Sequence, residues 1–422
     1  MISMQVTQSL LKQPSVSVKP ASMKERIARK AVFKVFENLR VGSLIVEEGG
    51  EVFSFGSPKK EGDLVAKIQV RNPAAYLNVL MRGTIGSGES YMQGDWTTPD
   101  LTNVIRIMVL NMSIVEKLDG DMSIGSKVSN WILRLANINT LTGSKKNIGA
   151  HYDLGNDFFE LFLDQEMMYS SAIYDDQHTS LDKAAVNKLR VICEKLKLNE
   201  NDHLLEIGTG WGGMAIYAAQ HYGCRVTTTT ISQRQFEYAS RRVEQLGLSG
   251  KIQVLLKDYR ELEGRFDKIV SIEMIEAVGH QYYQSYFSQC SRLLKEDGLM
   301  LIQAITIPDQ RYHAALKAVD FIQKYIFPGG CLPSNEVIAQ HVSKDTDMQI
   351  VGLHDITNDY ARTLKEWRHR FNKRLAEVKN QGFGDEFARM WEFYLCYCEG
   401  GFAERVISTA QILLAKPQAR IA

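Results

Sequence analysis

Long apolar runs are missing from this chain of 422 residues. No stretch approaches the length of about 18 apolar residues that a membrane-spanning helix needs. The N-terminal segment MISMQVTQSLLKQPSVSVKP is polar and lacks the apolar core of a secretory signal. The sequence therefore predicts neither a spanning helix nor export, and we expect a cytoplasmic protein.

Cysteine and proline are scarce, with 6 and 9 residues. The cysteines are scattered and form no CxxC pair, which argues against a disulfide framework and against a metal or redox motif. We therefore expect reduced thiols and no metal site. Because 45% of the residues are hydrophobic, a large core can form, and the length suggests two or three domains.

A net charge of one sign is missing as well, since 50 Lys and Arg balance 49 Asp and Glu. This near-neutral total gives no indication of a nucleic-acid partner. The charge is unevenly spread, however, because residues 1–150 carry 19 basic and 13 acidic side chains, a net +6, against −5 for the remainder. We expect the N-terminal part to face an anionic surface.

The N-terminal part is predicted to be a mobile lead-in over residues 1–22 and a smaller α+β domain over 23–140. Residues 23–40 space their apolar side chains as a helix does, and most other positions are basic. Such a helix either lies on an anionic lipid surface or packs on its own domain with a solvated basic face. Alternating runs at 43–56 and 64–70 predict a small antiparallel sheet, and the glycines of 83–101 predict a loop before a helix.

Helix and strand patterns alternate from about residue 181 onward. Apolar runs such as HLLEIG, CRVTTTT and LMLIQAIT are separated by helical segments, which implies crossover connections and a mostly parallel sheet covered on both faces. Helical patterns at 360–379 and 385–397 and strand-like runs at 348–356 and 406–416 complete this unit. We expect one α/β domain over 141–422.

A glycine-rich turn stands between a predicted buried strand and a predicted helix in LLEIGTGWGG. Gly208, Gly210 and Gly212 lie where the backbone must approach a ligand closely and a Cβ would clash. Glu206 precedes them, where a carboxylate suits the ammonium group of an amino-acid-like ligand and would repel a pyrophosphate. This pattern resembles the first motif of class I S-adenosylmethionine-dependent methyltransferases, although another Rossmann-like domain stays an alternative.

The end of the second strand departs from most such enzymes, because TISQRQ stands where an Asp or Glu usually binds the ribose. Together with HYDLGNDFFELFL, MYSSAIY, KDYREL, EMIEAVGHQYY and YIFPGGCLPS, this segment resembles the cyclopropane fatty acid synthases from His151 onward. GESYMQGDW resembles the N-terminal domain of the phospholipid-acting members. The resemblance implies a Rossmann-like α/β methyltransferase domain with a mostly parallel seven-stranded sheet.

The resemblance also implies an enzyme that transfers a methylene from S-adenosylmethionine to the cis double bond of unsaturated phospholipid acyl chains. In that reaction the alkene attacks the sulfonium methyl, and a base then removes a methyl proton from the carbocation so that the ring closes. The residues expected to hold the cofactor are Tyr169, Ser170, Glu206, Gly208, Gly210, Gly212, Thr230, Ile231, Ser232, Gln233, Gln235, Asp258 and Tyr259.

The base implied by the resemblance is a bound bicarbonate, held by Glu276, Tyr360 and the main chain of Ile305. Ser171 and Gln303 stand where the usual bacterial pattern has Cys and His, and they keep hydrogen-bonding capacity while losing a thiol and an imidazole. Methylation without ring closure, giving a methylene- or methyl-branched chain, is therefore an alternative.

Three of the implied catalytic residues also have simpler interpretations. Glu276 could cap a helix beginning near Gln281, and Tyr360 could simply pack. Cys398 falls where an active-site cysteine is often assigned in this family, but a buried cysteine is usually a small hydrophobe. A lipid-binding protein with a dead site and a small-molecule methyltransferase are weaker alternatives.

The expected partner is an unsaturated phospholipid, reached by peripheral binding to the inner face of the membrane, with no nucleic acid involved. Acyl-chain length, double-bond position and head-group preference do not follow from the sequence. A homodimer is likewise left open.

Overall fold

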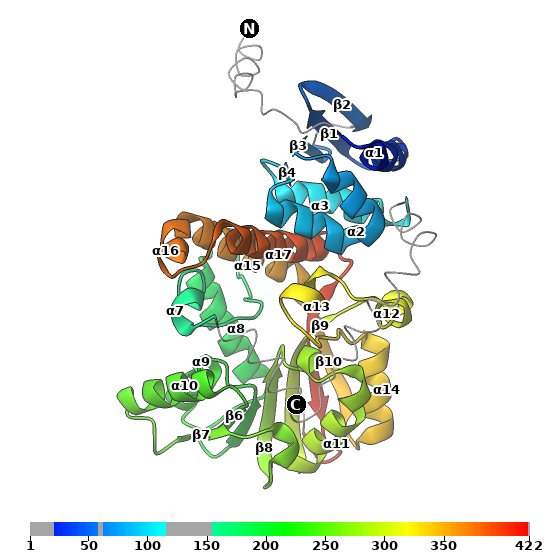
Figure 1. Cartoon of the computed structure of the whole chain (residues 1–422). Coiled ribbons are helices and arrows are strands. Elements are labelled where there is room, and N and C mark those ends of the chain that lie inside the picture. Colours follow the sequence, from blue (N-terminus) through cyan, green and yellow to red (C-terminus); the bar gives the residue numbers. More distant parts are fainter. Residues whose placement is uncertain (1–20, 58–61, 115–153, 421–422) are drawn as a thin grey trace. The chain divides into compact units, whose positions relative to one another are not determined.

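The computed structural model describes residues 21–57, 62–114 and 154–420 (Figure 1). The chain divides into two compact units, Met1–Ser126 with Asp385–Phe393, and Lys127–Gly384 with Tyr394–Ala422. The predicted lead-in falls almost wholly outside the described residues, as does the predicted boundary near residue 140, so both stay predictions.

The first unit is a small mixed sheet with helices. Its elements are α1 (Met23–Phe36), β1 (Ser43–Glu48), β2 (Glu51–Gly56), β3 (Val65–Val70), α2 (Ala74–Gln93), β4 (Trp96–Thr97) and α3 (Leu101–Leu110). The strand order is β2-β1-β3-β4. Gly49 and Gly50, with φ of 59° and 89°, turn the β1–β2 hairpin.

The prediction of an antiparallel sheet is wrong for one pair of strands. β1 pairs antiparallel with β2, and β3 with β4, but β1 and β3 are parallel. The reason is that the chain crosses after the hairpin to the other edge of β1 before β3 begins. Local alternation predicts strands but carries no information on this crossing.

The predicted glycine-rich loop is also wrong, because Gly83 to Gln93 lie within α2. Gly83 has φ 52° and kinks the helix, and Gly94 ends it with φ 80°. At Gly86 a Cβ would come within 2.0 Å of the Asn78 carbonyl oxygen, so the kinked helix needs glycine there. These glycines therefore allow one helix to bend and to end, and they do not form a loop.

The second unit contains a seven-stranded sheet in the order β10-β11-β9-β8-β5-β6-β7. Its strands are β5 (His203–Ile207), β6 (Arg225–Thr230), β7 (Ile252–Leu256), β8 (Phe266–Ile272), β9 (Leu294–Thr306), β10 (Gln349–Asp355) and β11 (Ser408–Ala415). β11 runs antiparallel to both of its neighbours, and the pairs among β5 to β9 are parallel. The predicted mostly parallel sheet is confirmed.

Helices precede and connect these strands along the chain. They are α7 (Asn156–Phe159), α8 (Leu181–Lys195), α9 (Gly213–His221), α10 (Gln233–Gln245), α11 (Tyr283–Leu293), α12 (Asp309–Ala315), α13 (Phe321–Tyr325), α14 (Asn335–Asp345), α15 (Thr357–Lys373), α16 (Leu375–Asn380) and α17 (Asp385–Ala403). Short 3₁₀ turns are η1 (Tyr259–Glu261), η2 (Ile275–Ala277) and η3 (His280–Tyr282). The two halves of α17 belong to different units.

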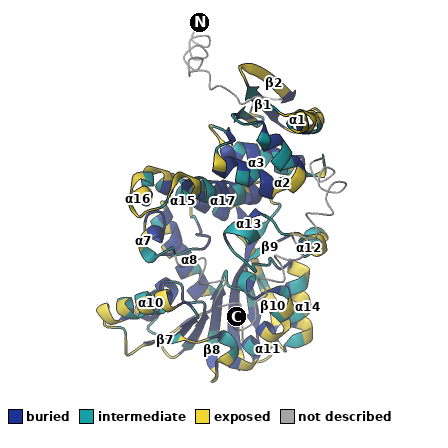
Figure 2. Ribbon diagram, in the orientation of Figure 1, coloured by how far each residue is buried: buried dark blue, intermediate teal, exposed yellow. Residues whose placement is uncertain are grey.

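Two apolar clusters cover the two faces of the sheet, as alternation along buried strands requires. Leu205 packs with residues of α11 and α14, whereas its neighbour Leu204 packs with residues of α8 and α9. Figure 2 draws the central strands in the colour of buried residues, while α10 carries exposed ones. The carboxyl ends of β5, β6, β8 and β9 are thereby held at one edge of a rigid sheet.

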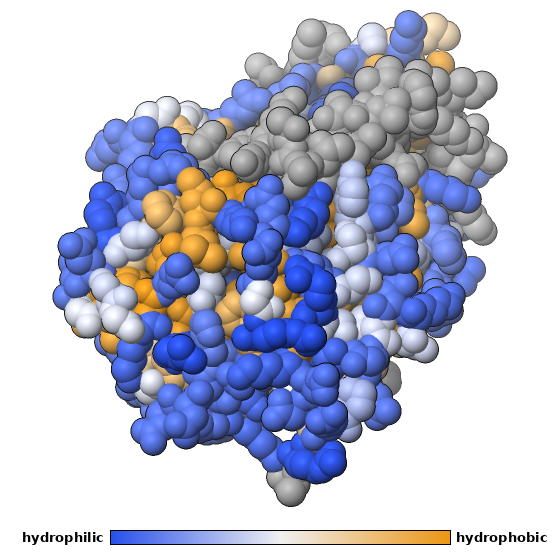
Figure 3. All heavy atoms as spheres, turned by 90° about the horizontal axis from the view of Figure 1, so that it is seen from below, coloured by the Kyte–Doolittle hydropathy of each residue, from blue (hydrophilic) through white to orange (hydrophobic). Residues whose placement is uncertain are grey.

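On the face drawn in Figure 3, hydrophilic side chains predominate and apolar ones gather in a limited central area. Among the residues that the structure describes, no helix is both long and apolar enough to cross a bilayer.

Candidate active site

The glycine-rich turn after β5 has the geometry of a ligand cradle. Gly208, Gly210 and Gly212 have φ of 102°, 51° and 89°, a region that side-chain-bearing residues rarely adopt. A Cβ on Gly210 would meet nothing within 4 Å, so the backbone there borders open space. The turn can therefore bring main-chain groups close to a bound molecule.

Glu206 lies on β5 just before this turn and is 2% exposed. Its Oε2 accepts a hydrogen bond of 2.6 Å from the Thr228 hydroxyl. Burial raises the pKa of Glu206 to about 8, while Thr228 and the charge of Lys188 act in the opposite direction. A buried carboxyl of this kind ionises when a cation binds beside it, so the turn and Glu206 fit S-adenosylmethionine with its ammonium group.

The segment after β6, from Thr230 to Gln235, is held by hydrogen bonds between its own residues. The Thr230 hydroxyl donates to Gln235 Oε1 at 2.8 Å and accepts from the Ser232 amide at 3.1 Å. Ser232 in turn caps α10. Ile231 and Gln233 complete this turn, which follows the strand next to β5.

Asp258 lies after β7 at the same edge of the sheet. Its carboxylate caps η1 and pairs with Arg260, at 2.7 Å between Oδ2 and Nη2. Burial raises the pKa of the neighbouring Tyr259, which therefore stays a neutral phenol. The structure thus brings the expected ribose and adenine segments to the sheet edge that carries the glycine turn.

Two further residues expected at the cofactor make contacts to other side chains. The Tyr169 hydroxyl lies 2.8 Å from the Tyr394 hydroxyl, and Ser170 Oγ accepts a 2.7 Å hydrogen bond from Lys188 Nζ. Lys188 has no exposed surface. Sequence reasoning missed this lysine, because a lysine on an amphipathic helix is normally solvated.

Glu276 lies in η2, directly after β8. Its Oε1 accepts a 2.5 Å hydrogen bond from the Ile305 amide at the end of β9. Its Oε2 is buried and has no hydrogen-bond partner among the described residues. α11 begins later, and its N-cap Tyr282 makes no side-chain cap, so helix capping is not the role of Glu276.

Three other expected catalytic residues, Ser171, Gln303 and Tyr360, meet at a glutamate that sequence reasoning missed, Glu273. Its Oε1 accepts from the Ser171 amide at 2.9 Å and from Gln303 Nε2 at 2.8 Å. Its Oε2 accepts from the Tyr360 hydroxyl at 2.8 Å. A carboxylate directly after a central strand is the signal that could have found it.

These contacts show whether the residues expected to bind bicarbonate have donors left for it. The side chains of Gln303 and Tyr360 and the backbone at Ser171 already donate to Glu273, and the Ile305 amide donates to Glu276. The residues present therefore do not fit a bound bicarbonate, because its donors are engaged by carboxylates of the chain itself.

A chain of hydrogen bonds orients the Gln303 amide. Lys195 Nζ donates to Gln411 Oε1 at 2.7 Å, and Gln411 Nε2 donates to Gln303 Oε1 at 3.0 Å. Since the Gln303 oxygen faces Gln411, its NH₂ group faces Glu273. Gln411 is a second side chain that the sequence did not single out.

Cys398 lies in the second half of α17 and is not a hydrogen-bonding member of this network. No hydrogen bond ties its thiol to the carboxylates among the described residues, and burial raises its pKa well above the ordinary thiol value. A thiol that stays protonated is a poor nucleophile. The small-hydrophobe interpretation therefore describes Cys398 better than a catalytic one.

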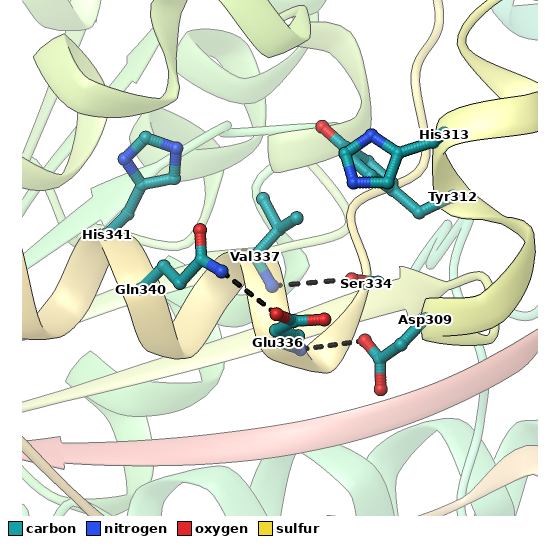
Figure 4. A pocket seen from close by; sticks show the side chains of 8 residues that line it. All are labelled: Asp309, Tyr312, His313, Ser334, Glu336, Val337, Gln340 and His341. Carbon is teal, nitrogen blue, oxygen red and sulfur yellow. Dashed lines mark hydrogen bonds between the residues drawn. The ribbon is translucent and has the colours of Figure 1, made fainter.

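A surface hollow between α12 and α14 contains none of the expected site residues (Figure 4). The Asp309 carboxylate accepts from the Glu336 amide at 2.9 Å, and the Ser334 hydroxyl accepts from the Val337 amide at 3.3 Å. Gln340 Nε2 donates to Glu336 at 3.0 Å. The first two contacts satisfy amides at the N-terminus of α14 and the third links side chains one turn apart, so these groups are structural.

Comparisons with known proteins agree with this geometry. A family model described as mycolic acid cyclopropane synthetase matches residues 139–412. The tuberculostearic acid methyltransferase UfaA1 of Mycobacterium tuberculosis is 37% identical over 341 residues, which cover 79% of this chain and 79% of that protein. The cyclopropane-fatty-acyl-phospholipid synthase of Escherichia coli is 37% identical over 359 residues, covering 84% and 89%.

Solved structures with the same fold include the mycolic acid cyclopropane synthase CmaA1 complexed with SAH and CTAB. It superposes with a TM-score of 0.61 at 30% sequence identity, covering 64% of this chain and 98% of that one.

Proposed function

The chain belongs to the mycolic acid cyclopropane synthetase family of S-adenosylmethionine-dependent methyltransferases, and from this premise we propose that it transfers a methylene group to the cis double bond of unsaturated phospholipid acyl chains. Residues 141–422 form the catalytic domain in this proposal, and residues 23–140 recruit the lipid. The relatives named for cyclopropane synthesis support the first assignment.

The observation that carries the proposal is the pair of carboxyl groups at the end of β8, Glu273 and Glu276. β8 lies beside β5, so this pair and the glycine turn share one edge of the sheet. Ring closure ends with loss of a proton from carbon, which requires a proton acceptor next to the reacting methyl. Two carboxyl groups at the carboxyl end of β8 supply such an acceptor.

S-adenosylmethionine, when bound, supplies a methyl carbon activated by the sulfonium charge. In our assignment Glu206 holds its ammonium group, the turn from Gly208 to Gly212 lies against its body, and the segment from Thr230 to Gln235 holds the ribose. Asp258 and Tyr259 border the adenine. The chain then has to align the alkene and exclude water.

A second product remains a candidate. The tuberculostearic acid methyltransferase is as similar to this chain as the cyclopropane synthase is, at 37% identity each. Proton loss after methyl transfer can form either a ring or a carbon–carbon double bond. A methylene- or methyl-branched chain is therefore the alternative product at the same site.

Peripheral membrane binding through α1 belongs to the same proposal. Met23 and Ile27 lie one turn apart and are 80% and 59% exposed. Lys24, Arg26 and Lys30 on the same helix are also exposed. Exposed apolar and basic side chains on one helix suit the inner face of an anionic membrane.

The test is to express the protein in a bacterial host that lacks its own synthase and to analyse fatty acid methyl esters by mass spectrometry. Unsaturated chains that gain the mass of one methylene and lose their double bond support ring closure. Chains that gain the same mass but keep a double bond favour the branched alternative. Unchanged chains, with soluble protein present, contradict the proposal.

A further inference from the structure

The environment of Glu273 is that of a bound anion. Three donors converge on its carboxylate, the Ser171 amide, Gln303 Nε2 and the Tyr360 hydroxyl, all within 2.8–2.9 Å. Burial raises the pKa of Tyr360 far above the ordinary value, so its hydroxyl stays a donor. Three fixed donors around one carboxylate stabilise its ionised form.

The backbone conformation of Glu273 is strained, so holding this side chain in place costs conformational energy. Glu273 has φ 47°, in the left-handed region that favours glycine. Its amide donates to the Gln303 carbonyl oxygen at 2.7 Å, which holds the strained residue against β9. Strain of this kind persists where the surrounding structure imposes it, and it clusters at functional sites.

On the basis of the function proposed above, we propose that the Glu273 carboxylate is the base that takes the proton from the transferred carbon, in place of a bound bicarbonate. The donors that the family resemblance assigns to bicarbonate point at Glu273. A carboxylate attached to the chain needs no recruitment from solution, which is the advantage of an intramolecular reactant.

The neighbouring carboxyl supports this choice of base. Burial, and then the charge of Glu273, raise the pKa of Glu276 to about 8, so Glu276 is protonated at neutral pH. Burial also raises the pKa of Glu273, but its three hydrogen bonds and the charge of Lys188 oppose that rise. Three donors contact the Glu273 carboxylate and one contacts that of Glu276, so the geometry favours Glu273 as the ionised member of the pair.

The acyl chain and Glu273 together account for the proton and the electron pair of this step. After the alkene has taken the methyl group, the adjacent carbon is a cation and the transferred carbon still bears three hydrogens. One proton moves to Glu273, and the electron pair of the broken C–H bond becomes the C–C bond that closes the ring. The carboxylate ends as a carboxylic acid and returns the proton to solvent before the next turnover.

The experiment compares wild type, Glu273→Gly and Glu273→Gln on vesicles of unsaturated phospholipid in buffer stripped of carbon dioxide, with and without bicarbonate. Wild-type turnover should not depend on bicarbonate. Glu273→Gly should lose about 10²- to 10⁴-fold in turnover and recover part of it when bicarbonate fills the vacated space. Glu273→Gln should be equally slow without recovery, because the amide fills that space.

A binding measurement makes the test independent of turnover. ¹³C-labelled bicarbonate should bind Glu273→Gly but not wild type by NMR, and S-adenosylmethionine should bind all three proteins with equal affinity by calorimetry. Glycine suits the positive φ, so Glu273→Gly should fold at least as well as wild type. Lys197→Gly, at an exposed residue that also has positive φ (52°), controls for the backbone change and should leave turnover unchanged.

A wild type that requires bicarbonate, or that binds the labelled anion, would overturn the proposal, as would full turnover by Glu273→Gln. If wild type forms no product in any buffer, the proposed function fails, and the labelled-anion measurement still decides whether Glu273 occupies the anion site. If Glu273→Gly does not fold, the bicarbonate dependence of wild-type turnover and the turnover of Glu273→Gln still decide the proposal.

Discussion

Replacing Glu276 by glutamine should make the stability of the protein less dependent on pH. The Glu276 carboxyl binds the Ile305 amide through Oε1, and its buried Oε2 has no hydrogen-bond partner among the described residues. Burial and the charge of Glu273 raise its pKa from 4.5 to about 8. The folded protein therefore favours the neutral acid at this position.

The expected size follows from proton linkage. Between about pH 4.5 and pH 8 the folded protein holds one proton more at Glu276 than the unfolded chain does, so the free energy of unfolding falls as the pH rises. The slope is at most about 1.4 kcal/mol per pH unit, or about 5 kcal/mol over the whole interval. Glutamine stays neutral and keeps an oxygen that accepts from Ile305, so the variant should lose this contribution.

Urea unfolding of wild type and Glu276→Gln at a series of pH values from 5 to 8 measures the difference directly. The two proteins should be similar near pH 5, and Glu276→Gln should be the more stable near pH 8. Glu263→Gln, which changes an exposed glutamate, is the control and should parallel wild type. Parallel curves for wild type and Glu276→Gln would refute the reasoning.

The same variant separates the two glutamates in catalysis. If Glu273 is the base, Glu276→Gln should keep turnover within about tenfold of wild type, because an amide replaces an acid that is already neutral. A loss as deep as that of Glu273→Gln would show that Glu276 is itself needed for proton removal, in line with its place in the anion site that the family resemblance implies.

Three further outcomes are expected. Glu206→Ala should weaken calorimetric binding of S-adenosylmethionine by about 1.5–3 kcal/mol through loss of a charge-assisted contact, and unchanged affinity would contradict the assignment. Gln411→Leu should leave that affinity intact but lower turnover, because the Gln303 amide loses the donor that orients it; unchanged turnover would count against this orientation. Exchange of Lys24 and Lys30 for glutamine should reduce co-sedimentation with anionic vesicles at low salt, and indifference to both lipid charge and salt would leave α1 a solvated face.

The sheet and the glycine turn were predictable because their signals are local. The buried runs at β5, β6 and β9 and the helices between them follow from periodicity, and LLEIGTGWGG carries its own strand, turn and helix start. The crossing that makes β1 and β3 parallel is not a local property. Neither is the kink that keeps Gly83 and Gly86 inside one helix.

The base cluster was only partly predictable, for the same reason. Ser171 and Tyr360 lie 102 and 87 residues from Glu273 along the chain, so their meeting depends on the tertiary fold. EMIE contains two glutamates, and the family motif directs attention to the second. The left-handed backbone at Glu273 decides which carboxylate meets the donors, and no pattern in the sequence predicts that conformation for a glutamate.

The electrostatics of the site favour a reaction that passes through positive charge. Burial raises the pKa values of Glu206 and Glu276 to about 8, so each stays neutral until a cation stabilises its ionised form. Lys188, whose own pKa burial lowers to about 8, carries positive charge among Glu273, Glu206 and Asp164. The ammonium group of the bound cofactor lowers the pKa of Glu206, so the cofactor itself generates the carboxylate that pairs with it, whereas Glu276 stays a neutral acid beside Glu273. A buried acid that ionises only beside a bound cation costs the empty site less than a permanent buried carboxylate would.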